Sequence, residues 1–176
     1  MIRLNKLTKY YHVAGEKKYI FKDVDMTIPD KKSVGVLGLN GQGKSTFINI
    51  LGGSDYPNSG SITTSKSISW PLGLSGSFQS SLTGKDNVKF VCRINSATRS
   101  EMIKKIDFVK DFSELGDYFD MPINTYSSGM KSRLSFALSM AFDFDIYLID
   151  EILSVGDKNF REKCKIKMQQ KIEKSS

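Results

Sequence analysis

Two short apolar runs indicate buried β-strands. Residues 34–37 read Val-Gly-Val-Leu, and residues 146–149 read Ile-Tyr-Leu-Ile. Nearly all-apolar runs are typical of strands in a parallel sheet, because both faces of such a sheet are covered. The sequence therefore predicts an α/β fold in which each run forms a strand of the core.

Elsewhere, apolar residues recur at the spacing of an α-helix, which places them on one face. Residues 46–51, which are separated from the first apolar run by residues 38–45, have helical character. Gly116 is expected to end the helical pattern of the middle of the chain. Three further stripes are Met102, Ile106 and Val109; Leu134, Leu138 and Ala141; and Phe160, Cys164, Met168 and Ile172.

A phosphate-binding loop, Gly-Leu-Asn-Gly-Gln-Gly-Lys-Ser at residues 38–45, joins the first run to its helix. Its glycines let successive N–H groups point into one concavity around phosphate oxygens, and the helix adds the positive end of its dipole. Lys44 is expected to reach the β- and γ-phosphates, and Ser45 to ligate Mg²⁺. By chance such a match arises in roughly one chain of this length in a few hundred. The residues predicted to bind nucleotide here are Gly38, Asn40, Gly41, Gln42, Gly43, Lys44, Ser45 and Thr46.

The second apolar run ends in two adjacent carboxylates, Asp150 and Glu151. Downstream of a phosphate loop, this is the arrangement in which Asp150 holds Mg²⁺ through its water shell and Glu151 polarises the attacking water as general base. Alone, an apolar run before Asp-Glu is a weak signal, common at strand ends. With the loop, it makes Glu151 and Lys44 the candidate catalytic residues.

A third motif, Ser127-Ser128-Gly129, precedes the helix that carries Leu134. Hydroxyls and a glycine at a helix start can form an anion site. They can equally be an ordinary N-cap. Periodicity alone does not decide between the two.

The three motifs, in this order and spacing, resemble the ATP-binding subunit of ABC transporters. Residues 126–130, Tyr-Ser-Ser-Gly-Met, correspond to the family's Leu-Ser-Gly-Gly-Gln signature; Ser127 and Gly129 match it, whereas Tyr126, Ser128 and Met130 depart from it. Together with residues 69–73, 76–84 and 155–157, this form is similar to the branch that exports capsular polysaccharide, close to the O-antigen and teichoic-acid exporters. The resemblance extends from Met1 to about Lys174.

The resemblance implies a single P-loop NTPase domain of the ABC ATPase type. Residues 1–83 would form an antiparallel β subdomain and the phosphate-loop core, residues 84–125 a small helical subdomain that docks on the permease, and residues 126–176 the signature helix, the acidic strand and a last helix. It also implies an ATP-hydrolysing subunit that uses ATP and Mg²⁺, pairs head to tail as a homodimer, and binds a membrane permease at the cytoplasmic face of the bacterial inner membrane.

Further residue roles follow from the resemblance. Tyr11, or alternatively Tyr19, would stack on adenine, and Gln79 would sense Mg²⁺ and contact the permease. The segment Ser127, Ser128 and Gly129 would complete the γ-phosphate site of the partner copy. Asp157 fits the loop that crosses the dimer interface.

Family members carry a γ-phosphate-contacting histidine after the next core strand, whereas the single histidine here is His12, near the opposite end. The sequence given stops at Ser176, where that strand should begin. In the family fold the strand lies between the phosphate-loop strand and the acidic strand, so its absence would leave the edges of both neighbours unpaired. Each orphaned buried polar group costs ~1–3 kcal/mol, against roughly 5–15 kcal/mol of net stability. We therefore expect a fragment or a degenerate gene product that binds ATP but hydrolyses it weakly, and a hydrolysis-deficient ATP-binding module is one alternative.

The net charge of +7 comes partly from the last segment, where Lys and Arg outnumber Glu. A face for nucleic acid or an anionic membrane is possible, and a soluble ABC-type ATPase acting on nucleic acid is a second alternative, although no nucleic acid is expected. A solvated helix face explains the charge more simply, given the stripe that begins at Phe160. Cys92 and Cys164 are expected to be core residues in a reduced compartment. No apolar run is long enough to span a bilayer, and no signal peptide is recognisable.

Overall fold

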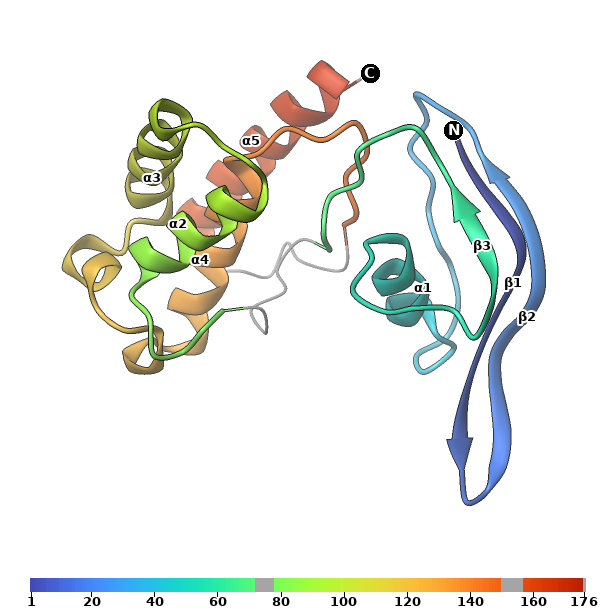
Figure 1. Ribbon diagram of the computed structural model, residues 1–176. Helices are drawn as coiled ribbons and strands as arrows, with labels where there is room; N and C mark the ends of the chain where they lie inside the picture. The colour runs from blue at the N-terminus through green and yellow to red at the C-terminus, as the bar shows by residue number, and fades with distance from the viewer. Residues whose placement is uncertain (72–77, 150–156, 176) are drawn as a thin grey trace. The chain divides into compact units, whose positions relative to one another are not determined.

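The computed structural model describes residues 1–71, 78–149 and 157–175, and the chain divides into two compact units (Figure 1). The sheet unit comprises Met1–Pro71, Phe144–Asp150 and Ser175–Ser176. The helical unit comprises Leu72–Asp143 and Glu151–Lys174.

In the sheet unit, β1 (Ile2–Val13), β2 (Glu16–Ile28) and β3 (Ser59–Thr63) form an antiparallel sheet in the order β2-β1-β3. Ala14 and Gly15, both with positive φ, make the two-residue turn between β1 and β2, as the twist of a hairpin favours. Helix α1 (Lys44–Leu51) buries apolar side chains together with those of β1. The shared core contains Ile2, Leu4, Leu7, Ile48, Ile50, Leu51 and Leu148.

The second apolar run lies beside residues 67–69 and runs parallel to them, but the predicted strand does not form: residue 146 makes one bridge, and residues 147–149 have no regular secondary structure. Ile68 and Ile146 form a parallel bridge, and the N–H of Ser69 donates to the carbonyl of Ile146 at 2.9 Å. Leu148 is buried, and its N–H donates to the Ser69 hydroxyl at 2.9 Å. In the described part of the chain, Ile68 and Ile146 are the only bridge pair recorded between these two segments.

The prediction of a strand at residues 34–37 is wrong for this structure. Residues 32–39 have no regular secondary structure, and Leu37 is 95% exposed. A strand exists only when its N–H and C=O groups pair with a neighbour, and no ladder pairing of this run is recorded within the described ranges. In the described residues, the phosphate loop therefore follows a segment without regular secondary structure or recorded ladder pairing.

The helical unit contains α2 (Gly84–Ile94), α3 (Arg99–Ser113), α4 (Ser128–Met140) and α5 (Lys158–Ser175), with the short 3₁₀ turns η2 (Gly116–Asp120) and η3 (Ile123–Thr125). Helix starts follow capping chemistry. Thr83 caps α2, and Thr98 forms a capping box with Glu101 at the start of α3.

The predicted helical stripes largely face the core of this unit. Val109, Leu134 and Leu138 are buried, as are Phe160, Cys164 and Met168, whereas Met102, Ile106 and Ile172 are half-buried. Cys92 and Cys164 are buried free thiols, which confirms their core placement. Gly116 does not end α3: the helix stops at Ser113, and Glu114 takes the left-handed C-cap conformation with φ of 55°.

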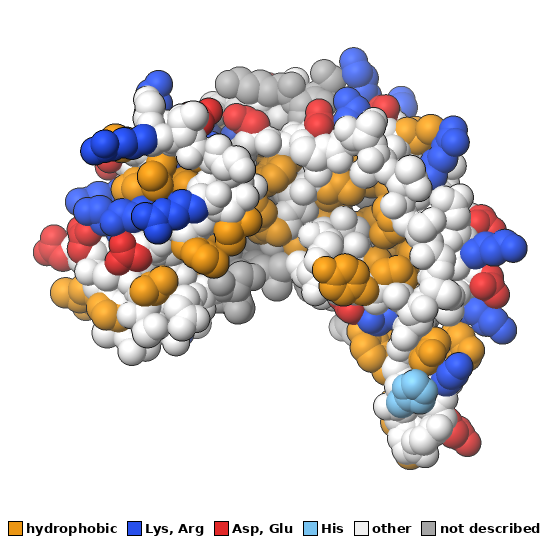
Figure 2. All heavy atoms as spheres, in the orientation of Figure 1, with side chains coloured by type: hydrophobic (Ala, Val, Ile, Leu, Met, Phe, Trp, Pro, Cys, Tyr) orange, Lys and Arg blue, Asp and Glu red, His pale blue; other side chains and the backbone are white. Residues whose placement is uncertain are grey.

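In Figure 2, blue Lys and Arg side chains lie among orange apolar ones on the helical unit. Part of the positive charge of the helical unit is paired internally. Lys171 donates to the Phe142 carbonyl at 2.9 Å and to Asp143 at 2.6 Å, and Lys163 donates to Glu114 at 2.6 Å. Across the ranges that the structure describes, no helix has the length and apolar character needed to cross a bilayer.

Candidate functional site

The phosphate loop has the backbone shape that its sequence predicts. Gly41 and Gly43 adopt left-handed conformations with φ of 80° and 88°. A Cβ at Gly43 would lie 2.0 Å from Cγ2 of Ile20, so no larger residue fits without displacing that side chain. Helix α1 begins at Lys44, directly after Gly43. The loop therefore turns sharply into the helix, as a phosphate cradle requires.

The side chain of Lys44 folds back over this loop. Its ammonium donates to the carbonyls of Gly38 and Leu39 at 2.8 and 2.9 Å. Gln42 also stabilises the loop, since its side-chain oxygen accepts from the N–H of Leu39 at 2.9 Å. The lysine head thus lies beside the concavity in which phosphate oxygens would be held.

The first turn of α1 fits an anionic ligand. Its N-cap, Gly43, supplies no side-chain acceptor, and no acidic residue lies in the first turn. The first N–H groups of a helix have no partner within it. These groups, the helix dipole and the Lys44 ammonium together favour a phosphate at this place.

The carboxylates Asp150 and Glu151 lie outside the described residues. The run that leads to them pairs with residues 67–69 up to the buried Leu148. Among the residues placed by the structure, no group of three or more His, Cys, Asp or Glu side chains could hold a metal ion. A Mg²⁺ bound here would depend on the Ser45 hydroxyl, Asp150 and the oxygens of the nucleotide.

The two candidate adenine-stacking residues differ in their anchoring. Tyr11, on β1, is 44% exposed, and its hydroxyl donates to Asp55 at 3.2 Å. Tyr19, on β2, is equally exposed, but its ring packs against Tyr10 with centroids 5.4 Å apart. Both lie in the sheet unit with the phosphate loop.

The signature segment caps a helix, as one of its two readings predicts. Ser127 is the N-cap of α4, and its hydroxyl accepts from the N–H of Met130 at 3.2 Å. Ser128 and Gly129 are exposed. Tyr126, where the family usually has leucine, is buried and donates to the carbonyl of Tyr118 at 2.5 Å; burial raises the pKa of this phenol to about 12.

Gln79 lies in the helical unit and is exposed. Asn87, a buried residue that the sequence did not single out, accepts from the N–H of Gln79 at 2.9 Å and donates to its carbonyl at 3.2 Å. The segment after Gln79 pairs with the segment before Ser127: the N–H of residue 123 donates to the carbonyl of residue 82 at 2.9 Å, and that of residue 124 to residue 80 at 2.9 Å. The glutamine and the signature segment are therefore joined by one hydrogen-bonded framework.

Asp157 caps α5. One carboxylate oxygen accepts from the N–H groups of Asn159 and Phe160 at 2.9 and 3.0 Å, and the other pairs with Arg133 of α4. The Phe160 N–H, followed by the charge of Arg133, holds the pKa of Asp157 below its usual range. Arg133 also lies 4.6 Å from the ring centre of Phe160, so Asp157 and Phe160 share this arginine.

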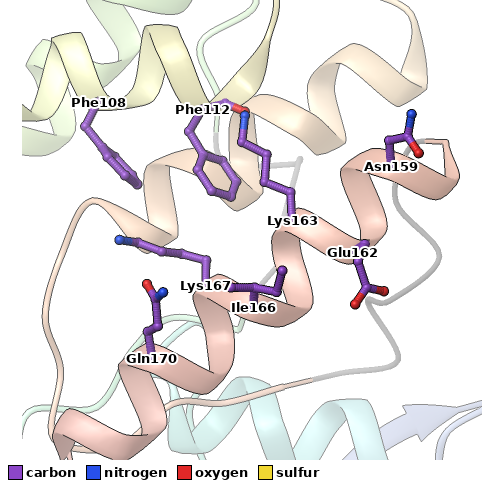
Figure 3. Close-up of a pocket in the computed structure, with 8 residues that line it drawn as sticks. All are labelled: Phe108, Phe112, Asn159, Glu162, Lys163, Ile166, Lys167 and Gln170. Atoms are coloured by element: carbon purple, nitrogen blue, oxygen red, sulfur yellow. The ribbon is translucent and has the colours of Figure 1, made fainter.

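A pocket of about 520 Å³ lies between α3 and α5 (Figure 3). Its floor is apolar, but the ammonium groups of Lys163 and Lys167 lie over the rings of Phe112 and Phe108, at 4.7 and 5.1 Å from their centres. It contains none of the residues predicted to bind nucleotide. Its lining residues are Phe108, Phe112, Asn159, Glu162, Lys163, Ile166, Lys167 and Gln170.

The structure thus assembles a phosphate loop in one unit and a capped signature helix beside a braced glutamine in the other. The sequence did not reveal Lys9, Asp55, Asn87 or Arg133. Lys9 and Asn87 are buried polar residues inside regular elements. A polar residue within an otherwise buried stretch is their only sequence signal.

A P-loop nucleotide-binding ATPase is the class that this fold and loop define. Residues 21–154 match the ABC transporter family. The chain is 57% identical over 164 residues to the polysialic acid transport ATP-binding protein KpsT of Escherichia coli, an overlap of 93% of this chain and 73% of that protein. It is 48% identical over 171 residues to the ATP-binding protein BexA of Haemophilus influenzae, with 97% and 77% covered.

The chain therefore belongs to the ABC transporter family, as one of its ATPase subunits. Among solved structures, the dimeric post-hydrolysis ATP-binding cassette MJ0796 bound to ADP and Pi aligns with a TM-score of 0.81, 24% identity, and coverage of 99% of this chain and 84% of that one. At this identity the likeness shows the shared fold alone.

Proposed function

We propose that this protein is the ATP-binding subunit that energises export of capsular polysaccharide through a membrane permease. The observation that carries the proposal is the phosphate loop, with left-handed Gly43, an uncapped helix start and Lys44 beside the concavity. The choice of substrate rests on the relatives, since KpsT is a polysialic acid transport protein and the meningococcal relative CtrD, 45% identical, is a capsule polysaccharide export protein.

The residues divide into three roles. The backbone of residues 41–45 and Lys44 hold the phosphates, and Tyr11 stacks on adenine. Ser45, Asp150 and Gln79 would hold or sense Mg²⁺, whose charge would offset that of the phosphate oxygens. Glu151 takes the proton of the attacking water as general base.

The second half of the site comes from another copy of the chain. Ser127, Ser128 and Gly129 present the N-terminus of α4, whose dipole favours an anion. In a head-to-tail homodimer this segment faces the phosphate loop of the partner, so that ATP binding closes the pair and hydrolysis opens it. The permease and the cytoplasmic face of the inner membrane complete the proposed setting.

Two measurements test this function. Glu151→Gln, which removes the general base, should form a dimer with Mg·ATP in light scattering, and the added substitution Lys44→Ala should abolish that dimer. In detergent extracts, the tagged protein should co-purify with a membrane permease. An ATP-bound Glu151→Gln protein that stays monomeric, or one that retains RNA or DNA instead of a permease, would contradict the proposal.

A further inference from the structure

A buried lysine in β1 is the starting point. Lys9 is only 7% exposed, although lysine is among the residues least often buried without a partner. Its ammonium donates to Asp55 at 2.7 Å and to the Tyr56 carbonyl at 2.8 Å. It also lies 5.0 Å from the ring centre of Tyr11. The ammonium group thus donates hydrogen bonds to the loop that carries Asp55 and Tyr56, and it lies over an aromatic ring of its own strand.

Asp55 links the same three groups from the other side. One of its oxygens accepts from Lys9 and the other from the hydroxyl of Tyr11 at 3.2 Å. The hydrogen bond from Lys9 is the main cause that holds the pKa of Asp55 below its usual range. Asp55 is therefore ionised near neutral pH and fixes the edge of the Tyr11 ring, while Lys9 lies over that ring.

The loop that carries Asp55 is itself fastened to the phosphate-loop helix. The N–H groups of Ser54 and Asp55 donate to the carbonyl of Asn49, in α1, at 2.9 and 3.3 Å. On β1, the N–H of Asn58 donates to the Thr8 carbonyl at 2.9 Å. A continuous chain of contacts thus runs from α1, through Asp55, to the ring of Tyr11.

We propose that Lys9 and Asp55 are positioning residues that set the Tyr11 ring at a fixed place relative to the phosphate loop, so that it receives the adenine base. This inference rests on the proposed function, in which Tyr11 is the stacking residue. A ring held before the ligand arrives loses less rotational freedom on binding. Tyr19 contacts Tyr10, and its ring centre lies 5.5 Å from the Lys22 ammonium, but both partners belong to the β1–β2 hairpin. The contacts of Tyr11 lead instead through Asp55 to α1, which is why the geometry favours Tyr11.

The test separates the base from the phosphates. Calorimetry measures the affinity for Mg·ATP and for magnesium tripolyphosphate, which lacks a base. Tyr11→Ala should weaken ATP binding about tenfold, because base–aromatic stacking has that order of strength. Asp55→Asn and Lys9→Met should weaken it about three- to fivefold through loss of the charged hydrogen bond. All three should leave tripolyphosphate binding within a factor of two.

Two further variants keep the result interpretable. Tyr11→Phe keeps the ring and loses only its bond to Asp55, so it tests the link even if Asp55→Asn fails to fold; about twofold weaker ATP binding is expected. Asp120→Asn removes exposed ion pairs with Lys85, at 3.4 Å, and Lys110, at 3.9 Å, in the helical unit, and should change the affinity for neither ligand.

Each pattern of results has one meaning. If Tyr11→Ala binds ATP like the wild type, Tyr11 is not the stacking residue, and that part of the proposed function is wrong. If Tyr11→Ala weakens ATP binding but Asp55→Asn and Tyr11→Phe do not, the proposed function stands and the positioning role is overturned. If Asp55→Asn weakens ATP and tripolyphosphate equally, the pair is merely structural, which also overturns the proposal.

Discussion

Helices α1 and α4 both start at a candidate phosphate-binding motif, and they start differently. Helix α1 follows a left-handed glycine that offers no side-chain acceptor. Helix α4 follows Ser127, whose own hydroxyl accepts from the N–H of Met130. The first N–H groups of α1 remain available to a ligand, whereas one N–H group of the first turn of α4 is already bound by the Ser127 side chain. We infer that α1 binds phosphate within a single chain and that α4 contributes only when a second copy brings a phosphate to it.

The largest expected effect lies at the start of α1. Lys44→Ala should lower the affinity for Mg·ATP about 100-fold, because it removes a charged donor to the phosphates. Isothermal titration calorimetry measures the change. Lys32→Ala, an exposed lysine of the same unit, is the matched control and should bind normally. Equal affinities of the two variants for Mg·ATP would contradict the inference that the start of α1 binds phosphate within a single chain.

The second prediction concerns the backbone of the loop. Gly43→Ala should lower the free energy of unfolding by about 2–5 kcal/mol, since a Cβ in a left-handed position is strained and also meets Ile20. Gly41→Ala carries the same strain but meets nothing within 4 Å, so about 1–2 kcal/mol is expected. Urea unfolding of both variants tests this. A smaller loss for Gly43→Ala than for Gly41→Ala would show that the loop is not held against β2.

A smaller effect is expected at the start of α4. Ser127→Ala removes the N-cap acceptor and should cost about 1 kcal/mol of stability, whereas Ser127→Gly should cost only a few tenths. Chemical denaturation followed by circular dichroism distinguishes them. In the single chain, Ser127→Ala should leave Mg·ATP affinity unchanged; a loss comparable to that of Lys44→Ala would show that α4 acts without a partner.

The smallest effect is a pH dependence at the start of α5. The pKa of Asp157 is lowered in the folded state, chiefly by the N–H of Phe160. A lowered folded-state pKa stabilises the fold above the unfolded value, near 3.8, and this contribution is lost as the pH falls through the folded pKa. Between pH 5 and about 3, Asp157→Asn should lose less stability than the wild type. If the free energy of unfolding of Asp157→Asn and of the wild type changed equally with pH, the stabilising role of ionised Asp157 would be contradicted.

The sequence predicted well wherever local chemistry decides the structure. The loop at residues 38–45, the N-cap at Ser127 and the buried positions of Phe160, Cys164 and Met168 all follow from spacing and capping rules. These features depend on a few neighbouring residues, so a single sequence contains most of the necessary information.

It failed where a distant partner decides. Residues 34–37 have the composition of a buried strand, but without a neighbouring ladder they form no regular secondary structure, and Leu37 is exposed. The links from Lys9 to Asp55 and from Arg133 to Asp157 join residues far apart in the chain. No periodicity marks such pairs, because their contact exists only after the elements have packed.

The most direct test of the central claim is a calorimetric titration of Mg·ATP into the folded wild-type protein. We predict saturable binding with one nucleotide per chain, competed by magnesium tripolyphosphate, because the start of α1 binds phosphates. Two results together would contradict the claim: a folded protein that gives no binding heat at several temperatures, and a thermal stability that does not change when tripolyphosphate is added.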